Sequence, residues 1–427
     1  MGQNVKLIKV QKIEVDHPFN SGTHKEMDGY RNSYSTVMFT CKTETEVIEV
    51  IKKVSQPGQR LIIPDGSFDE NIVSDNNELA IIDLSSMNAV HIDEVSKIAT
   101  IEAGVTAAQL NRETMAYGLV TPLAPISKMK IAYMVTSGGF GFLRGLYGLT
   151  SDNVVGLNVV TATGELLYVN RFEHPDLFWA IRGSRKSFGV VTKLELKLYP
   201  LKTNILAIDV LYDVKDFQQI IQRAEEYRNN AVDEITFHFV LTNMRQTNKN
   251  NSASKSIRLI GVFAGELNKK VEEELIQPLL ELATPIADNT EVIPYEEIES
   301  KYAQLFDGTN AMRKYFFMTE LQGETLQMVK DYVEQALIPV TIHLLALHGQ
   351  LKRTSRLDSA FKFRDANYLV IVELNHNQSP EKAQEWLAAV SEIVEADVIT
   401  QKNSSEDFTL NKVLEMKIKY DPANQFD

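Results

Sequence analysis

The sequence of 427 residues contains a single cysteine, Cys41. One cysteine cannot form an intramolecular disulfide, and it cannot supply the several thiolates of a cysteine-based zinc or iron–sulfur site. The eight histidines show no zinc-binding spacing such as His-Glu-x-x-His. The sequence therefore predicts neither a disulfide framework nor a metal site.

Positive charge is also scarce, because 57 Asp and Glu residues outnumber 44 Lys and Arg residues and leave a net charge of -13. An acidic chain gains nothing from the counterion release that drives nucleic-acid binding, so no nucleic-acid partner is expected. No apolar run is long enough to span a bilayer, and the first residues lack the apolar core of a signal peptide. We therefore expect a cytoplasmic protein with no membrane partner.

The length and an apolar fraction of 44% indicate a soluble protein of two or three packed units. Up to about residue 200, short strands punctuated by glycine alternate with short helices. In "ETEVIEVIKKV" the apolar residues recur at helical spacing (Val47, Ile48, Ile51 and Val54), and "VVGLNVVTATGELLYV" predicts a hairpin that turns at Thr163-Gly164. Beyond it, strands such as "EITFHFVLTN" alternate with longer charged helices, which favours an antiparallel sheet with helices on one face. The end, "FTLNKVLEMKIKYDPANQFD", predicts a helix that stops at Asp421-Pro422.

Two glycine-containing stretches are candidates for ligand binding. In "RLIIPDGSFDENIVSD" a strand-like run meets Pro64 and an Asp65-Gly66 turn, and a strand that ends at a glycine turn is a common anion site. "TSGGFGFLRGLYGLTSDN" is neither a Walker A loop, since no Gly-Lys-Ser/Thr follows, nor a Rossmann motif, since Arg144 stands at the third glycine. Its glycines either let a ligand approach the backbone closely or form a tight turn without a ligand.

No sequence pattern assigns a catalytic role to any histidine of the chain. His343 and His348 lie five residues apart on the predicted strand "VTIHLLALHG", so they point to opposite faces and at most one reaches a shared pocket. A single histidine on a strand is more often a packing residue than a catalyst. No Ser/His/Asp arrangement can be assembled from the sequence.

Several longer segments occur in an order that is typical of one enzyme group. They are "IIDLSSMNAV", "TIEAGV", "DNVVGLNVVTATGELLYVNRFEHPDLFWAIRG", "FGVVTKLELKLYP" and the terminal "KYDPANQF". Together they resemble the berberine-bridge-enzyme-like FAD-linked oxidoreductases of the vanillyl-alcohol-oxidase/PCMH superfamily. The match is strong from about residue 30 to 200 and clear at the C-terminal helix.

The resemblance implies an α+β fold with two domains. Residues 1–200 would form a PCMH-type FAD-binding domain, with α+β subdomains at about 30–95 and 96–200. Residues 201–404 would form a substrate domain whose antiparallel sheet is flanked by helices, and 405–427 would be a helix that returns to the FAD domain.

The resemblance also assigns FAD contacts to three segments. The turn after the first strand would hold the pyrophosphate with backbone amides, the glycine segment would run along the isoalloxazine, and a third segment would contact the adenosine. The residues so assigned are Pro64, Asp65, Gly66, Ser67 and Phe68; then Ser137, Gly138, Gly139 and Gly141, with Asn153; and finally Gly189, Val190 and Val191.

The chain departs from the family at both covalent flavin anchors. Ser67 or Phe68 stands where the family has its flavin-linked histidine, and the second anchor, a cysteine, would fall near Ile126. Cys41 lies too early in the chain to replace it. We therefore expect FAD to be bound non-covalently.

A second glycine-rich loop of the family is changed to "GSRKSFG". Its Arg185 and Lys186 either offset the lost glycines with charge-assisted hydrogen bonds to the pyrophosphate or form a solvated surface turn.

At the position where relatives carry a catalytic carboxylate or amide, this chain has an apolar residue. Aligning "FRDANYLVIVEL" without gaps places Val372 where relatives carry a carboxylate or amide, and Glu373 is one residue away. Side chains alternate along a strand, so one of the two points into the site and the other does not. The candidate catalytic residues are His343, His348 and Glu373.

The resemblance implies an FAD-dependent oxidoreductase acting on a small organic molecule in secondary metabolism. The alternative is a flavin-free relative, such as a cyclase, a lyase or a binding protein, that reuses the same pocket. A purely structural partner protein is a third, weaker reading, since so long a two-domain chain usually carries a pocket. The sequence shows neither the substrate nor the oligomeric state.

Overall fold

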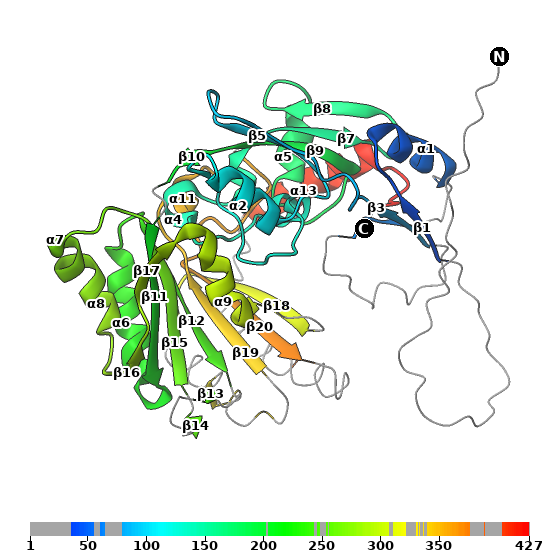
Figure 1. Ribbon diagram of the computed structural model, residues 1–427. Coiled ribbons are helices and arrows are strands. Elements are labelled where there is room, and N and C mark those ends of the chain that lie inside the picture. The colour runs from blue at the N-terminus through cyan, green and yellow to red at the C-terminus, as the bar shows by residue number, and fades with distance from the viewer. Residues whose placement is uncertain are drawn as a thin grey trace, which may run out of the picture.

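The structure is a computed structural model that describes most of the chain. The described residues are 36–54, 60–64, 79–201, 204–242, 246–247, 253–254, 256–306, 311–321, 330–331, 333, 336, 340–375, 388 and 404–426. They form two bodies side by side (Figure 1). The first domain holds β1 to β10 with the C-terminal helix, and the second domain holds the larger sheet.

The first domain begins with a small parallel sheet whose strand order is β1-β3-β2. The α1 helix covers it, because Val47, Ile51 and Val54 recur at helical spacing and are buried. Since the strands are parallel, their carboxyl ends lie at one edge of the sheet. These elements are β1 (Thr36–Thr40), α1 (Glu44–Val54), β2 (Arg60–Ile62) and β3 (Leu79–Asp83).

A five-stranded antiparallel sheet, in the order β4-β5-β9-β7-β8, forms the rest of the first domain. The predicted hairpin at Thr163-Gly164 is confirmed, and it joins β7 to β8. The strands are β4 (Val90–Asp93), β5 (Ile98–Glu102), β7 (Val154–Val160), β8 (Leu166–Asn170) and β9 (Val190–Lys197), with the short pair β6 (Leu119–Val120) and β10 (Tyr199–Pro200). The helices are α2 (Ala107–Met115), α3 (Ile131–Ser137), α4 (Arg144–Tyr147) and α5 (Pro175–Ile181).

The second domain is built on one large sheet, in the order β16-β11-β15-β12-β19-β20-β18, with β17 also paired to β11. Its pairings among the described residues are antiparallel, as the sequence predicts. The strands are β11 (Asn204–Asp213), β12 (Ile235–Thr242), β15 (Ser256–Phe263), β16 (Pro285–Asp288), β17 (Glu291–Pro294), β18 (Ala311–Met318), β19 (Val340–Ala346) and β20 (Tyr368–Asn375). The helices are α6 (Phe217–Asn229), α7 (Lys269–Val271), α8 (Gln277–Leu280), α9 (Ile298–Phe306) and α11 (Gln350–Arg353).

The two faces of the large sheet pack against different partners. One face carries Phe237 and Val372 in a core shared with α6 and α8. The opposite face carries Val240, which packs with Tyr302 of α9 and with Phe142 of the first domain. The prediction of helices on one face alone is therefore wrong, because α9 covers part of the face that meets the first domain.

The C-terminal helix α13 (Ser404–Tyr420) lies beside α5 in the first domain (Figure 1). Val413, Met416 and Tyr420 join the core of the five-stranded sheet. Beyond the helix, the Leu61 N–H of β2 donates to the Gln425 carbonyl at 2.8 Å. The chain end is therefore built into the first domain, and the helix ends where Asp421-Pro422 predicts.

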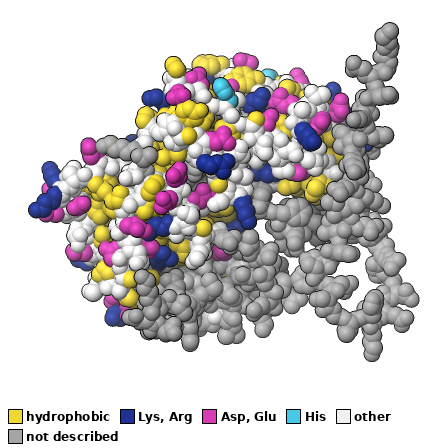
Figure 2. All heavy atoms as spheres, viewed as in Figure 1, with side chains coloured by type: hydrophobic (Ala, Val, Ile, Leu, Met, Phe, Trp, Pro, Cys, Tyr) yellow, Lys and Arg dark blue, Asp and Glu magenta, His cyan; other side chains and the backbone are white. Residues whose placement is uncertain are grey.

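Acidic and basic side chains are interspersed over the described part of the face shown in Figure 2, with no broad patch of one sign. Among the described helices, none is both long and apolar enough to cross a bilayer.

Candidate functional site

The carboxyl edge of the parallel sheet carries a lysine that the sequence did not single out. Pro64 follows β2, and Asp83 ends β3 at the same edge. Lys130 reaches this edge from the start of α3: its Nζ donates to the Pro64 carbonyl at 3.0 Å and lies 3.7 Å from Asp83 Oδ1. Ligands commonly bind beyond the carboxyl ends of parallel strands. The four other residues assigned to this turn lie outside the described part of the chain: Asp65, Gly66, Ser67 and Phe68.

The glycine segment begins at the end of α3, where Ser137 donates its hydroxyl to the Tyr133 carbonyl. Gly138 and Gly139 have φ of 105° and 80°, which side-chain-bearing residues rarely adopt. A Cβ at Gly139 would lie 2.2 Å from Thr150 Oγ1, and one at Gly141 would lie 2.4 Å from the Leu123 carbonyl oxygen. Packing within the protein therefore requires glycine at positions 139 and 141. A tight turn without a ligand is enough to explain both residues.

The neighbouring assigned residues are engaged by the protein itself. Asn153 donates to the Leu149 carbonyl at 2.7 Å and accepts from the Tyr199 hydroxyl at 2.7 Å. Gly189 has φ 157°, and a Cβ there would lie 2.5 Å from the Val160 carbonyl oxygen. Val190 is fully buried in a core, so any contact that it makes with a ligand comes through backbone atoms, whereas the side chain of Val191 is half-buried.

Two buried hydroxyls beside the glycine segment lack partners among the described residues. They are Thr121 Oγ1 and Ser151 Oγ. The backbone N–H of Ser151 donates to the Gly138 carbonyl at 2.9 Å, so this hydroxyl lies next to the two glycines of positive φ. An unpaired buried hydroxyl costs free energy unless a ligand or water bonds to it. Both atoms are therefore suited to a polar ligand at this segment.

Arg185 lies at the junction of the two domains. It has φ 59°, its N–H donates to the Thr136 carbonyl at 2.8 Å, and its guanidinium carbon is 5.1 Å from the Tyr315 ring centroid. Arg185 and Lys186 are both exposed. This geometry favours the surface-turn reading, with a cation–π contact to the second domain.

The face of the large sheet that meets the first domain carries a polar row. In register across β18, β20 and β19 lie Arg313, Glu373 and Thr341. Arg313 Nε donates to Glu373 Oε2 at 2.7 Å. Burial alone would lower the pKa of Arg313, but the charge and hydrogen bond of Glu373 raise it above its ordinary value. Val372 is fully buried on the helix-covered face, so β20 turns Glu373 and not Val372 toward the first domain.

The position of this face is fixed by aromatic packing. Phe317, on the same side of β18 as Arg313 and Tyr315, lies 5.9 Å from the ring of Phe140 in the glycine segment. Aromatic packing therefore joins the strand that carries Arg313 to the glycine segment.

The two candidate histidines contact different surroundings. His343 is buried beside His238, with ring centroids 5.9 Å apart, and it stacks on Phe306. His348 lies just beyond β19, which ends at Ala346, and its Nε2 is 2.7 Å from the Ile235 carbonyl oxygen. Burial lowers both pKa values to about 4, helped by Arg313 at His343 and by Arg144 at His348. Both imidazoles are therefore neutral near pH 7.

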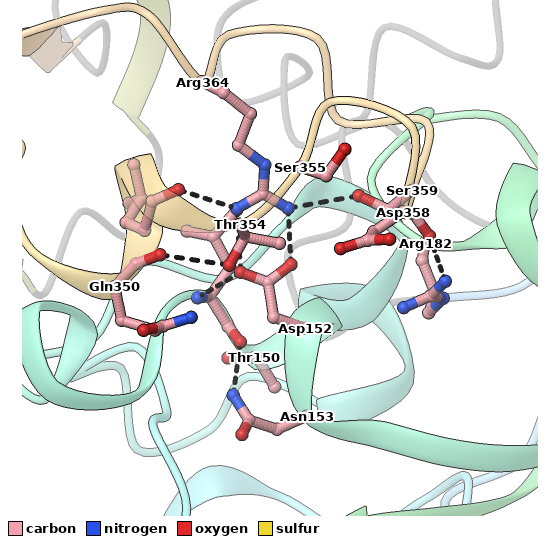
Figure 3. Close-up of polar contacts among 12 residues, drawn as sticks. Thr150, Asp152, Asn153, Arg182, Gln350, Thr354, Ser355, Asp358, Ser359 and Arg364 are labelled. Atoms are coloured by element: carbon pink, nitrogen blue, oxygen red, sulfur yellow. Dashed lines mark hydrogen bonds and ion pairs between the residues drawn. The ribbon is translucent and has the colours of Figure 1, made fainter.

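Two arginines that the sequence did not identify as site residues hold the domains together. Arg364 of the second domain pairs with Asp152 of the first, with Nη1 2.8 Å from Oδ2, and donates to Ser359 Oγ at 3.1 Å (Figure 3). Asp152 also accepts from the Leu149 N–H at 2.9 Å. Asp152 lies in the glycine-containing stretch and Arg364 lies in "FRDANYLVIVEL". No sequence pattern near either residue shows that the two form an ion pair.

Arg144, which stands where a Rossmann motif has its third glycine, has a structural role. It is 2% exposed, and its guanidinium donates to the carbonyls of Phe237 and Ala346, each at 2.9 Å. Burial lowers its pKa to about 9. Arg144 therefore anchors the glycine segment to the second domain.

Comparison with known proteins gives this geometry its context. The FAD binding domain family matches residues 35–170. (R)-6-Hydroxynicotine oxidase of Paenarthrobacter nicotinovorans is 26% identical, with 97% of this chain and 95% of that protein aligned. Berberine bridge enzyme-like 25 of Arabidopsis thaliana is 31% identical over 45% of this chain and 36% of its own length. The structure of BBE-like 1 from Physcomitrella patens has a TM-score of 0.80 at 17% identity, covering 92% of this chain and 90% of its own.

The chain is an FAD-linked oxidoreductase that is similar to the berberine-bridge-enzyme-like proteins of the vanillyl-alcohol-oxidase/PCMH superfamily. The expected fold, the FAD cofactor and the oxidoreductase class are thereby confirmed. No finding favours the flavin-free alternative.

The residues of this oxidoreductase fit FAD. The unpaired Ser151 and Thr121 hydroxyls suit the polar atoms of a flavin, and the Lys130 ammonium suits an anionic group at the carboxyl edge of β2 and β3.

Proposed function

We propose that this protein oxidises a small organic molecule, with FAD bound non-covalently in the first domain and the substrate bound against the polar row of the second. The (R)-6-hydroxynicotine oxidase relative is named for one such small organic molecule. When bound, FAD accepts the two electrons that the oxidation releases. Backbone atoms of the glycine segment and of the turn at Pro64 would hold it, together with the two unpaired hydroxyls.

The observation that carries this proposal is the direction of Glu373. It lies on the face of the sheet that meets the glycine segment, whereas Val372 is in the opposite core. A carboxylate there can accept a proton from the substrate. Arg313 Nε donates a 2.7 Å hydrogen bond to this carboxylate and so holds it in position on the sheet face.

The two histidines are weaker candidates for this role. His348 Nε2 is already 2.7 Å from the Ile235 carbonyl oxygen, and the His343 ring stacks on Phe306. Their burial beside aromatic rings indicates a packing role instead. We therefore assign proton removal to Glu373.

Non-covalent binding is supported by the side chains at the anchor positions. Ile126 cannot form a bond to flavin. Cys41 is buried in the core of the parallel sheet, and burial, followed by Glu46 and Asp83, raises its thiol pKa to about 12. A thiol that stays protonated is a poor nucleophile, so Cys41 does not replace the missing anchor.

The test is to purify the protein and precipitate it with acid. We expect a flavin absorbance band in the native protein and all flavin fluorescence in the supernatant after precipitation. A fluorescent pellet would contradict non-covalent binding. Anaerobic bleaching of the flavin band by candidate amines, alcohols and sugars would then identify the substrate class, and Glu373→Gln should slow that bleaching.

A further inference from the structure

The lysine at the carboxyl edge of the parallel sheet is placed by backbone contacts from both halves of the first domain. The N–H of Ile131 donates to the Val105 carbonyl at 3.1 Å, which ties the start of α3 to the five-stranded sheet. Lys130, one residue earlier, extends from this start to Pro64 and Asp83 of the parallel sheet. Its ammonium therefore lies where the two halves meet.

The ammonium is mostly buried, yet its present partners use little of its bonding capacity. The Lys130 side chain is 12% exposed. Within the part of the chain that the structure describes, it makes one hydrogen bond, to the Pro64 carbonyl at 3.0 Å, while Asp83 at 3.7 Å is beyond hydrogen-bond length. Lys417, by contrast, donates to Ser187 O, Asp421 Oδ2 and Phe426 O. An ammonium has three N–H donors, so two of those on Lys130 have no acceptor among the described residues and can bond to a ligand.

The nearby carboxylate is already satisfied without the lysine. Asp83 accepts from the Ser85 N–H at 3.0 Å and from the Ser85 hydroxyl at 2.8 Å. A mostly buried cation with a loosely placed carboxylate is costly to desolvate, and an added anion would offset that cost. The Lys130–Asp83 pair is therefore an incomplete explanation of why a lysine is kept here.

We propose that Lys130 binds the pyrophosphate of FAD. This rests on the proposed position of the cofactor at the turn that begins at Pro64. The sequence of this turn, from Pro64 to Phe68, contains one glycine, Gly66, and Asp65 adds a negative charge. A lysine ammonium is a common phosphate ligand, acting as a point charge with charge-assisted hydrogen bonds. Lys130 thus takes the role that Arg185, over the Tyr315 ring, does not fill.

The test compares ligands that contain or lack the pyrophosphate. Dissociation constants of the flavin-free protein are measured for FAD, ADP and riboflavin, with Lys130→Gln as the variant. Loss of one charge-assisted contact should weaken FAD and ADP binding by on the order of tenfold to a hundredfold and leave riboflavin binding unchanged. It should also flatten the salt dependence of ADP binding. Lys128→Gln, an exposed lysine of the same segment, is the matched control and should change none of these values.

Asp83→Asn separates a phosphate ligand from a structural ion pair. Removing this carboxylate frees Lys130 and removes a negative charge, so ADP should bind more tightly. A structural pair would instead make both variants less stable, with the same loss for riboflavin as for ADP, and that result overturns the proposal. Unchanged ADP binding in Lys130→Gln also overturns it. If the parent protein binds FAD and riboflavin but not ADP, the inference about Lys130 fails while the proposed function stands; if the parent binds no flavin, the proposed function fails as well.

Discussion

Arg364 and Asp152 form a buried, bidentate ion pair that joins the second domain to the first (Figure 3). Their side chains are 2% and 8% exposed. Asp152 also holds the Leu149 N–H, and Leu149 lies against Gly138. The ion pair therefore fixes the glycine segment relative to the sheet that carries Glu373.

Asp152→Asn should lower the free energy of unfolding by about 3–5 kcal/mol, because it leaves a buried guanidinium without a counter-charge. Urea denaturation of the flavin-free protein measures the change. Lys419→Gln removes a more exposed ion pair, with Asp176, and should cost less than about 1 kcal/mol. Equal losses in the two variants would show that the buried Arg364–Asp152 pair stabilises the protein no more than an exposed ion pair does.

Glu373→Gln should lower turnover by about a hundredfold or more, because the amide cannot accept a proton. Flavin binding should not change, since Glu373 contacts Arg313 and lies on the second domain. Steady-state kinetics and flavin titration separate the two effects. Glu226→Gln on the exposed surface of α6 is the control, and His343→Gln should retain more activity than Glu373→Gln. Normal turnover in Glu373→Gln would show that another group accepts the proton from the substrate.

Stability should fall as the pH is lowered from about 6.5 to about 4, with His343 and His348 among the causes. Their pKa values are lowered from 6.5 to about 4 in the folded protein, so between these values the unfolded chain binds more protons. Each histidine then contributes a slope of up to roughly 1.4 kcal/mol per pH unit, with stability rising as the pH rises. His343→Gln should show a smaller slope than the parent in urea denaturation at pH 4.5 to 6.5. An identical slope would mean that His343 is accessible to protons in the folded state.

Gly139→Ala should destabilise the protein more than Gly118→Ala. Both glycines have positive φ, of 80° and 65°, so both variants carry a backbone cost of about 1–2 kcal/mol. A Cβ at Gly118 meets nothing within 4 Å, whereas one at Gly139 meets Thr150 Oγ1 at 2.2 Å. The difference between the two unfolding free energies therefore measures the clash alone. If the variants are equally stable, the Thr150 side chain can move away.

Local pattern in the sequence was enough to determine individual elements. The spacing of Val47, Ile51 and Val54 predicted α1, and the turn at Thr163-Gly164 predicted the β7–β8 hairpin. These features depend on neighbours within a few residues, so the sequence displays them directly. The family resemblance added the domain type and the FAD cofactor, because it rests on several motifs in order.

The candidate site needed the tertiary structure. The sequence reduced the carboxylate position to Val372 or Glu373, but the choice depends on which sheet face is covered by α6 and α8. Lys130 meets Pro64 across 66 residues, and Arg364 meets Asp152 across 212. Strand alternation and helical spacing extend over only a few residues, whereas ion pairs and buried hydrogen bonds depend on where distant segments pack. The sequence by itself therefore determined the elements and the family, and only the packing of distant segments decided which side chains form the site.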